Sequence, residues 1–389
     1  MPLCYFTAGE SHGKGLTAIL EGLPSNIPIL EETINIQLKR RMQGYGRGGR
    51  MKIETDEVEI TSGVRHGVTL GSPISLWIEN KDFRAWTEEM ASYPIPGFTS
   101  KKSVNEPRPG HADLSGGIKY NQRDLRNILE RASARETTAR VAVGAVCREF
   151  LRTFGIRVTG HVIKMGGVGI GDERPDFDAI EKTQEADPCR CIDAAVSAKM
   201  QGIIDVAKKK GDTVGGVFEI IFTGLPVGLG SHVQWDRKLD AKLAATMLSI
   251  QAIKGVEFGM GFGVGEVYGS QVHDPIAYDK VAHLFSRTRN NAGGLEGGMT
   301  NGMPLVVRGA MKPISTLYTP LPSVNIDSKE SFDASVERSD TCAVPAASVI
   351  AENVLCVDIA SAMIEKFGGD SLEEMLRNYR AYQEYVKAY

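Results

Sequence analysis

Residues 343–364 read AVPAASVIAENVLCVDIASAMI. Small and apolar side chains would cover most faces of a helix over this stretch, which predicts a deeply buried helix rather than a surface one. Pro345 suits the first turn of such a helix, where its missing amide hydrogen is not needed. Asp340 or Thr341 is expected to cap the helix, and an anionic Asp340 is favoured at its positive end. We therefore predict a buried helix over 344–366.

The rest of the chain mixes strand-like and helical patterns without a regular alternation. Strand-like runs lie at 16–22, 52–64, 74–80, 156–163, 214–227 and 304–311. Helical patterns lie at 31–42, 123–154, 191–209, 236–250 and 371–388. Loop-like sequence fills 81–122, 255–302 and 313–340. Since no regular strand–helix–strand order appears, we expect an α+β fold of layers rather than a doubly wound sheet. No change of composition marks a linker, so a single large domain over 1–389 is expected.

Composition and charge argue against several classes of protein. The chain has 389 residues, with 45 Lys and Arg against 48 Asp and Glu, which gives a net charge of −3. General binders of nucleic acid or anionic membranes usually carry a basic field, so neither partner is expected. No continuous apolar run reaches the roughly 18 residues of a membrane span. The N-terminal residues lack the basic and apolar regions of a signal peptide, so secretion is not expected.

Cysteine and histidine spacings argue against a disulfide framework and a metal centre. The six cysteines include one close pair, Cys189-x-Cys191, which lacks the C-x-x-C spacing of zinc and redox sites. We therefore expect reduced thiols in a cytoplasmic protein. The seven histidines form no H-x-x-H or H-E-x-x-H pattern, so no metal is expected.

Two glycine-rich motifs near the N-terminus resemble phosphate loops without matching them. GESHGKG at 9–15 has only three residues between Gly9 and Gly13, so it is not a P-loop. It places His12 in a turn that a ligand can approach closely. GYGRGGR at 44–50 precedes a strand-like run rather than a helix, so the context of a dinucleotide-binding fold is missing.

A basic cluster surrounds the second of these motifs. Its members are Lys39, Arg40, Arg41, Arg47, Arg50 and Lys52. Three interpretations stay open from the residues alone: a solvated basic face, an RNA-binding segment of the RGG type, and an arginine-lined pocket for phosphate or carboxylate groups. The acidic total charge argues against RNA, whose binding depends on basic residues that neutralise phosphates.

Two further segments carry groups suited to acid–base chemistry on an anion. RPGHAD at 108–113 places Arg108 beside His111, and histidine is the usual proton carrier near neutral pH. KPIST at 312–316 offers one ammonium group and two hydroxyls, which suit a phosphate.

Arginines are also spaced regularly in the predicted helix over 123–154. Arg131 and Arg135 are four residues apart and are expected to share a face, where they would repel unless they held an anion or a carboxylate. Glu136 can pair with Arg140 at the same spacing. From the residues alone, the chain suggests acid–base chemistry on a small, multiply anionic substrate.

Eight segments, in order along nearly the whole chain, resemble the chorismate synthase family. They are GESHGKG (9–15), GYGRGGRMKIE (44–54), RPGHAD (108–113), RASARETTARVA (131–142), IQAIKGVEFG (250–259), GGLEGGMTNG (293–302), KPIST (312–316) and RSDTCAVPAASVIAEN (338–353). The resemblance implies a β-α-β sandwich of antiparallel sheets and helices that assembles as a homotetramer. It also implies a lyase of the shikimate pathway that uses reduced FMN to remove phosphate and hydrogen from 5-enolpyruvylshikimate 3-phosphate, a 1,4-anti elimination that gives chorismate.

The resemblance also implies roles for individual residues. His12 matches the acid beside the leaving phosphate, His111 a residue near flavin N1, and Asp340 the base acting with flavin N5. The substrate's phosphate and carboxylates would be held by Ser11, Arg47, Arg50, Arg108, Ser133, Arg135 and Arg338. FMN would meet Arg131, Ala132, Ser133, Gln251, Ala252, Gly297, Lys312, Pro313, Ile314, Ser315, Thr316 and Arg338. Ala132 departs from the family, where serine is common, so only a backbone contact with the flavin is expected there.

The reducing equivalents would come from NADPH. Arg41 and Arg47 match positions linked to NADPH in the family. The chain shows no sign of the flavin-reductase segment of bifunctional relatives, so an external reductase is expected. A phosphate-dependent lyase that works without flavin stays open as an alternative.

Overall fold

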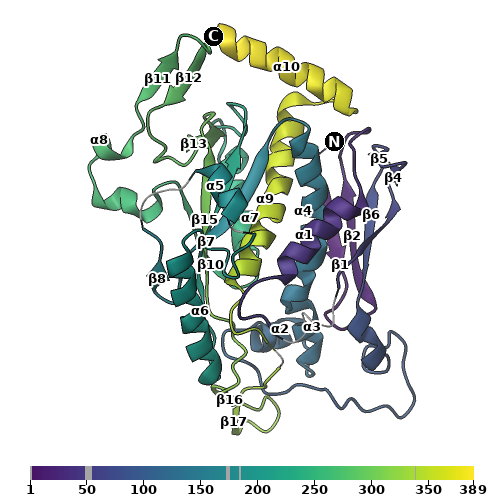
Figure 1. The fold of residues 1–389 in the computed structure, drawn as a ribbon. Helices are drawn as coiled ribbons and strands as arrows, with labels where there is room; N and C mark the ends of the chain where they lie inside the picture. The colour runs from purple at the N-terminus through teal and green to yellow at the C-terminus, as the bar shows by residue number, and fades with distance from the viewer. Residues whose placement is uncertain (1, 49–54, 172–175, 184, 338) are drawn as a thin grey trace.

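The computed structural model describes residues 2–48, 55–171, 176–183, 185–337 and 339–389. Two antiparallel sheets enclose a layer of helices (Figure 1). The first sheet has the order β1-β2-β6-β3, with bounds Cys4–Ala8, Gly15–Glu21, Ile74–Glu79 and Val58–Ser62. The second has the order β10-β15-β9-β7-β8, with bounds Ile253–Phe258, Leu305–Met311, Gly216–Thr223, Arg157–Met165 and Val168–Gly169. The α+β fold class, a β-α-β sandwich, is confirmed.

The inner layer is built around α9 (Val344–Phe367), which packs against α1 (Glu31–Met42), α4 (Thr137–Arg152) and α7 (Leu239–Leu248). By length and composition α9 could span a membrane, but 89% of its most apolar window is buried inside the fold. Its contacts with both β7 and β9 show that it belongs to the core. A single hydrophobic cluster joins α9 to both sheets.

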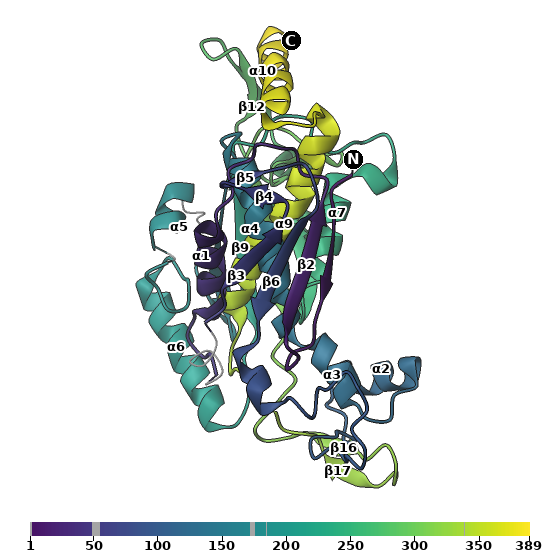
Figure 2. The ribbon, with the colours of Figure 1, turned by 90° about the vertical axis from the view of Figure 1, so that its right-hand side faces the viewer.

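The remaining elements lie outside this sandwich. The other helices are α2 (Asp113–Tyr120), α3 (Arg126–Ala132), α5 (Phe177–Thr183), α6 (Ala194–Lys209), α8 (Gly269–Val272) and α10 (Leu372–Ala388). Two-residue to four-residue strands form the hairpins β4–β5 (Val64–Arg65, Val68–Thr69), β11–β12 (Ile276–Asp279, Leu284–Arg287), β13–β14 (Leu295–Glu296, Met299–Thr300) and β16–β17 (Pro322–Val324, Ser331–Asp333). Short 3₁₀ helices lie at Lys81–Ala85, Ala134–Glu136, Trp235–Arg237 and Gly261–Glu266. Figure 2 shows α2, α3 and β16–β17 together at one end of the sandwich.

Most of the predicted core elements are found within a few residues of their expected bounds. The helix over 344–366 is confirmed as α9, and Pro345 lies in its first turn. The expected cap is wrong, because Ala343 occupies the cap position and no side chain bonds there. Asp340 instead pairs with the Arg47 side chain and accepts a hydrogen bond from the Gly48 amide, both far away in sequence.

The continuous helix expected over 123–154 is also wrong. It breaks at Ser133, whose backbone is extended (φ −62°, ψ 142°) and whose hydroxyl accepts a hydrogen bond from the Arg135 amide. Because of this break, Arg131 and Arg135 do not share a face: the first bonds the backbone of β1 and the second bonds Asp56. Arg140 bonds Ser249 rather than Glu136, so that expected pair is wrong too.

All three stretches expected as loop-like contain regular structure. Residues 81–122 include α2, 255–302 include α8 and two hairpins, and 313–340 include the β16–β17 hairpin. Strand β1 was not expected from the sequence. It is five residues long, and Phe6 at its centre is 77% exposed, so the strand has little of the buried alternation that marks longer strands.

Candidate active site

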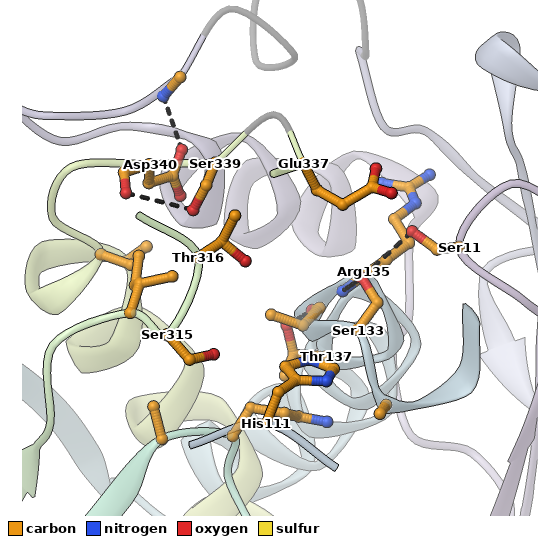
Figure 3. Close-up of a pocket in the computed structure, with 18 of the residues that line it drawn as sticks. Ser11, His111, Ser133, Arg135, Thr137, Ser315, Thr316, Glu337, Ser339 and Asp340 are labelled. Carbon is orange, nitrogen blue, oxygen red and sulfur yellow. Dashed lines mark hydrogen bonds between the residues drawn. The ribbon is translucent and has the colours of Figure 1, made fainter. Parts of the chain in front are cut away.

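A cavity of about 420 Å³ opens where the N-terminus of α9 meets the α3–α4 junction. The rest of its lining comes from the turn after β1, the 41–48 segment, Asp82 and Trp86, the 108–112 loop, the 250–252 turn and the 311–316 loop. Figure 3 shows Ser11, Ser133 and Arg135 on one side of this space, with Ser315, Thr316 and Asp340 facing them. The cavity has the size range of a small-molecule or cofactor site.

Most of the predicted site residues meet at this cavity. Its lining includes Ser11, His12, Arg41, Arg47, Arg108, His111, Ala132, Ser133, Arg135, Gln251, Ala252, Lys312, Ile314, Ser315, Thr316 and Asp340. These residues come from seven of the eight motif segments, all but 293–302, and Arg41 comes from α1. Tertiary folding therefore gathers groups that are hundreds of residues apart in sequence.

His12 lies in the turn after β1 and is held on two sides. Its Nδ1 lies 2.8 Å from Oε1 of Glu130, a side chain only 2% exposed. The imidazole also stacks on the indole of Trp86, with ring centroids 3.9 Å apart. Gly9 makes the turn possible, because its φ of +112° and the nearby Gly15 carbonyl leave no room for a side chain.

His111 is paired with a buried carboxylate in a similar way. Its Nδ1 lies 2.5 Å from Oδ1 of Asp113, which is fully buried at the start of α2. Burial alone would raise the pKa of Asp113, but hydrogen bonds and charges from His111 and Arg108 hold this pKa well below its usual range. Asp113 is therefore an ionised acceptor that orients both of these cavity residues.

Arg108 links the histidine loop to the 312–316 loop. Its Nε bonds Asp113 at 2.9 Å, and its Nη1 donates to the Thr316 hydroxyl at 2.8 Å. Lys312 makes a second link between the two loops, because its Nζ donates to the Gly110 carbonyl of the histidine loop at 2.6 Å. Burial, with help from the charge of Lys254, lowers the pKa of Lys312. The two loops thus present a cation and hydroxyls to the cavity as one bonded unit.

Arg135 and Arg41 share one buried carboxylate, Asp56. The Nη1 of Arg135 lies 2.6 Å from Asp56 Oδ1, and its Nε donates to Asn80 at 2.9 Å. Arg41 lies 3.8 Å from the other oxygen of Asp56 and donates to the Thr137 hydroxyl. These bonds fix both guanidinium groups at the cavity wall, because a planar fork bonded to two fixed acceptors cannot rotate freely.

Asp340 forms the opposite wall, just before α9. Its Oδ2 lies 2.7 Å from Nη1 of Arg47, and its Oδ1 accepts from the Gly48 amide at 2.6 Å. The basic segment after α1 therefore turns toward the cavity, which counts against a solvated basic face and against an RNA-binding segment. Arg50 and Lys52 lie outside the described residues.

Ala252 occupies an unusual backbone conformation at the cavity. Its φ is +69°, a left-handed value that costs energy for any residue with a side chain. The carbonyl of Ala252 accepts a hydrogen bond from the Lys312 amide at 2.9 Å, which ties this strained turn to the 312–316 loop. Strain of this kind is concentrated at functional sites.

The remaining predicted residues lie elsewhere. Arg131 points to β1, where its Nη2 donates to the Thr7 carbonyl at 2.8 Å, and Pro313 is not among the lining residues of the cavity. Gly297 lies in the β13–β14 turn, away from the cavity. Arg338 lies outside the described residues. The roles of these residues stay predictions.

Sequence reasoning missed the residues that orient the site. Glu130, Asp113 and Asp56 are buried acids that bond His12, His111 and Arg135, and none was singled out. The signal for Asp113 was present in RPGHAD, where an acid follows the histidine by two residues. Glu130 and Asp56 gave no such signal, since their partners lie 118 and 79 residues away.

Among the described residues, no group of three or more His, Cys, Asp or Glu side chains is placed to hold a metal ion. The donors around the cavity are instead arginines, a lysine and hydroxyls, beside an apolar wall of Ala346, Ala347 and Ile350 from α9. Such a combination fits a ligand with an apolar ring system and an anionic group, as a flavin mononucleotide has. The residues present therefore fit the flavin cofactor that the motif resemblance implies.

Comparison of the fold identifies the class of protein first. The structure resembles a crystal structure of a chorismate synthase with a TM-score of 0.81 and 44% sequence identity, covering 100% of this chain and 99% of the other. The sequence is 57% identical over 386 residues to a chorismate synthase from Brevibacillus brevis and 54% identical over 388 residues to one from Listeria innocua. Each alignment covers 99% of this chain and 100% of the relative.

A family model gives the particular assignment. The model described as chorismate synthase matches residues 3–364, nearly the whole chain. The chain therefore belongs to the chorismate synthase family, and the resemblance seen in its motifs is confirmed.

Proposed function

We propose that this chain catalyses the 1,4-anti elimination of phosphate from 5-enolpyruvylshikimate 3-phosphate, giving chorismate, with reduced FMN as cofactor. The observation that carries the proposal is one cavity lined by two histidines, each bonded to a buried carboxylate, and by several arginines. Family membership supports the same reaction. The enzyme would then be a lyase that acts on a carbon–oxygen bond to phosphate.

The arginines of the cavity would bind the anionic groups of the substrate. Arg108 and Arg135 are held by Asp113 and Asp56, and Arg47 is held by Asp340. Preorganised cations stabilise charge that develops on a leaving phosphate without having to move during the reaction. Ser11 and Ser133, whose hydroxyls lie 3.1 Å apart, add donors on the same side of the cavity.

Proton transfer would be divided between opposite walls. His12 would give a proton to the leaving phosphate, and Asp340 would take part in removing the hydrogen from the substrate carbon. His111 would hydrogen-bond the cofactor with its ring fixed by Asp113. Reduced flavin, when bound, supplies electron density that side chains lack. Lys312, Ser315, Thr316, Ser133, Gln251 and Ala252 would hold this cofactor.

We further propose a cytoplasmic homotetramer that receives reduced flavin from a separate, NADPH-dependent reductase. Five of the six cysteines are buried, and all six are free thiols, which suits a reducing compartment. Exposed apolar side chains on the α8 and β11–β12 region, including Phe262, Tyr268 and Val281, suit contacts between subunits. Light scattering coupled to gel filtration would measure the assembly directly.

The decisive experiment is an anaerobic assay with photoreduced FMN and 5-enolpyruvylshikimate 3-phosphate, followed by the absorbance of chorismate. Chorismate formation that requires FMN is the expected result. Phosphate release without FMN would support a flavin-free lyase instead, and no turnover of this substrate would contradict the proposal. The variant His12→Asn should turn over substrate about 10²–10⁴ times more slowly, the usual loss when a positioned proton donor is removed.

Lys312→Ala tests the FMN site separately. The ammonium group would meet the flavin phosphate or ring, and a hydrogen bond from a charged group contributes about 1.5–3 kcal/mol. We expect the FMN dissociation constant, measured by fluorescence titration, to rise by about 10- to 150-fold. Lys387→Ala, a lysine on α10 that is 50% exposed, is the matched control and should bind FMN normally. Wild-type affinity in the folded Lys312→Ala variant would remove this loop from the FMN site.

A further inference from the structure

Glu130 bonds the turn that carries His12 at three points. The Ser11 amide donates to the Glu130 main-chain carbonyl at 3.0 Å, and the His12 amide donates to Glu130 Oε2 at 2.8 Å. The imidazole Nδ1 lies 2.8 Å and 3.1 Å from the two carboxylate oxygens. One glutamate at the end of α3 thus fixes both the backbone and the ring of His12.

We propose that Glu130 is a positioning residue, which fixes the proton on Nδ1 of His12 and so assigns Nε2 as the nitrogen that transfers a proton to the leaving group. This inference rests on the proposed function for the identity of the leaving group, a phosphate. The position of the proton on the His12 ring does not depend on the proposed function, because the Glu130 carboxylate alone determines it.

The chemistry follows from the partners of the ring. An ionised carboxylate only accepts hydrogen bonds, so the bonded Nδ1 carries its hydrogen. Burial acts to raise the pKa of Glu130, but the hydrogen bonds and charge of His12 outweigh it, and this pKa is lowered. Arg126, whose Nη1 lies 3.7 Å from Glu130 Oε1, also favours the ionised form. Glu130 therefore stays an acceptor throughout the neutral range.

The proton balance is then simple. The doubly protonated ring gives its Nε2 proton to a phosphate oxygen as the substrate carbon–oxygen bond breaks and its electron pair leaves with the phosphate. The ring keeps its Nδ1 proton, bonded to Glu130, and is neutral after the transfer. A proton from water restores the starting state before the next turnover.

Trp86 fixes the plane of the ring that Glu130 orients. The indole lies 3.9 Å from the imidazole, and Nζ of Lys102 lies 3.3 Å above the same indole. Both contacts restrict movement of the indole, and the stacked imidazole is restricted with it.

The chain contains a matched histidine–glutamate pair away from the cavity. His161 on β7 and Glu219 on β9 are cross-strand partners in the second sheet, and both are buried. His161 Nε2 lies 3.3 Å from Glu219 Oε1. The pKa of Glu219 is lowered by His161 and Arg308, although burial acts to raise it. Glu219→Gln therefore removes a buried acid from a histidine without touching the cavity.

The test compares Glu130→Gln with Glu219→Gln in full-length protein labelled with ¹⁵N-histidine. The His12 resonances are assigned by their loss in His12→Asn. In the wild type at neutral pH we expect the His12 Nδ1 to be protonated. In Glu130→Gln we expect the His12 nitrogen signals to shift, and kcat to fall by about 10²-fold, the cost of misplacing a reacting group by about 1 Å, with KM little changed. Glu219→Gln should leave both the His12 signals and kcat unchanged.

Two results would overturn the proposal. One is wild-type kcat in folded Glu130→Gln protein. The other is a lower kcat with unchanged His12 nitrogen signals, because the loss would then be merely structural. If Glu130→Gln does not fold, Glu130→Asp keeps the charge on a shorter side chain and is judged by the same two measurements. If the wild type makes no chorismate, the proposed function fails, while the nitrogen spectrum still decides the role of Glu130.

Discussion

At the scale of the residue, the site depends on acids that hold its cations. Glu130, Asp113 and Asp56 are all buried, and each bonds a histidine or arginine that lines the cavity. Buried charges are tolerated only when they are paired and hydrogen-bonded. The pairing fixes the direction of each cation, so the cavity can bind an anion without reorganising its own side chains.

Asp340→Asn should separate a role in chemistry from a role in folding. Asparagine can still accept a hydrogen bond from the Gly48 amide, but it cannot take up a proton at neutral pH or pair with Arg47. We expect kcat to fall by about 10²–10⁴-fold, the usual contribution of a positioned base. The melting temperature should fall only slightly, since a single partly exposed ion pair contributes at most about 1 kcal/mol.

A matched control for Asp340 is Asp178→Asn, which breaks an Arg–Asp pair on the surface with Arg157. It should leave kcat unchanged. Full activity in Asp340→Asn would rule out the role as a base. A large loss of melting temperature with unaltered kcat would show that Asp340 is structural.

At the scale of the element, close packing of α4 on α9 depends on one glycine. A methyl group built on Gly144 would lie 2.2 Å from the main-chain oxygen of Asn353, which is far inside van der Waals contact. The backbone of α9 cannot yield easily, because the helix is surrounded by both sheets. The small residue therefore determines how near the two central helices approach.

Gly144→Ala should lower the free energy of unfolding by about 1–3 kcal/mol, the cost of overpacking a core, measured by chemical denaturation. This outcome opposes helix propensity, which favours alanine over glycine by about 0.8–1.0 kcal/mol. The matched control is Gly202→Ala on α6, where nothing lies within 4 Å of the added methyl group. That variant should be stabilised. Equal stabilisation of both variants would show that α4 and α9 can separate at no cost.

At the scale of the whole molecule, a buried ion cluster joins the helical layer to the second sheet. Glu352 on α9 is fully buried and lies 2.7 Å from Arg40 on α1, 3.0 Å from Arg148 on α4 and 2.6 Å from Arg190. Arg190 in turn donates to the Gly160 carbonyl in β7. Burial acts to raise the pKa of Glu352, but the three arginines lower it to about 2.

Glu352→Gln should destabilise the protein by about 3–5 kcal/mol, because it removes the fully buried counter-charge that three arginines share and leaves Arg40 and Arg190 only the partly exposed Glu185. The measurement is urea unfolding at pH 7. Since the folded pKa lies below the unfolded one, this stabilisation is present above about pH 4.3 and is lost as the pH falls toward 2. The control is Glu185→Gln, whose side chain is 38% exposed in the same cluster and should cost less. Equal losses would mean that burial of Glu352 does not determine its contribution.

A second acid on α9, Asp358, contributes to folding stability with the opposite dependence on pH. Burial raises the pKa of Asp358 to about 7, although a hydrogen bond from Thr246 and the charges of Lys242 and Arg140 act to lower it. Its Oδ2 has no hydrogen-bond partner. Between about pH 4 and 7 the folded state keeps a proton that the unfolded state has released, so stability from this residue falls as the pH rises through this range.

Asp358→Asn should therefore raise the free energy of unfolding at pH 8 by about 1–3 kcal/mol and change it little at pH 4, since one pKa unit corresponds to about 1.4 kcal/mol. Thermal or urea unfolding at both pH values measures the difference. The control on the same helix is Glu365→Gln, whose side chain is 59% exposed, and it should show no such pH dependence. A gain that is the same at pH 4 and pH 8 would contradict the role of ionisation.

The sequence by itself determined the central helix, and it singled out most of the predicted residues that line the candidate cavity. The apolar pattern of 343–364 is local, so it predicts burial of α9 whatever surrounds it. The motifs that hold His12, His111 and Asp340 were recognisable because their residues are adjacent in the chain. Bounds of α1 and β6 were likewise predicted nearly to the residue, since their periodicity depends only on which face is buried.

Tertiary structure alone decided which groups bond one another. The break at Ser133 replaces a helix that local periodicity favours, because the chain must turn there to send Arg131 to β1 and Arg135 to Asp56. Glu130 reaches His12 across 118 residues, and no local pattern encodes that distance. The hydrogen bonds that orient a site form between elements, so they depend on how helices and sheets pack, whereas periodicity describes only one element at a time.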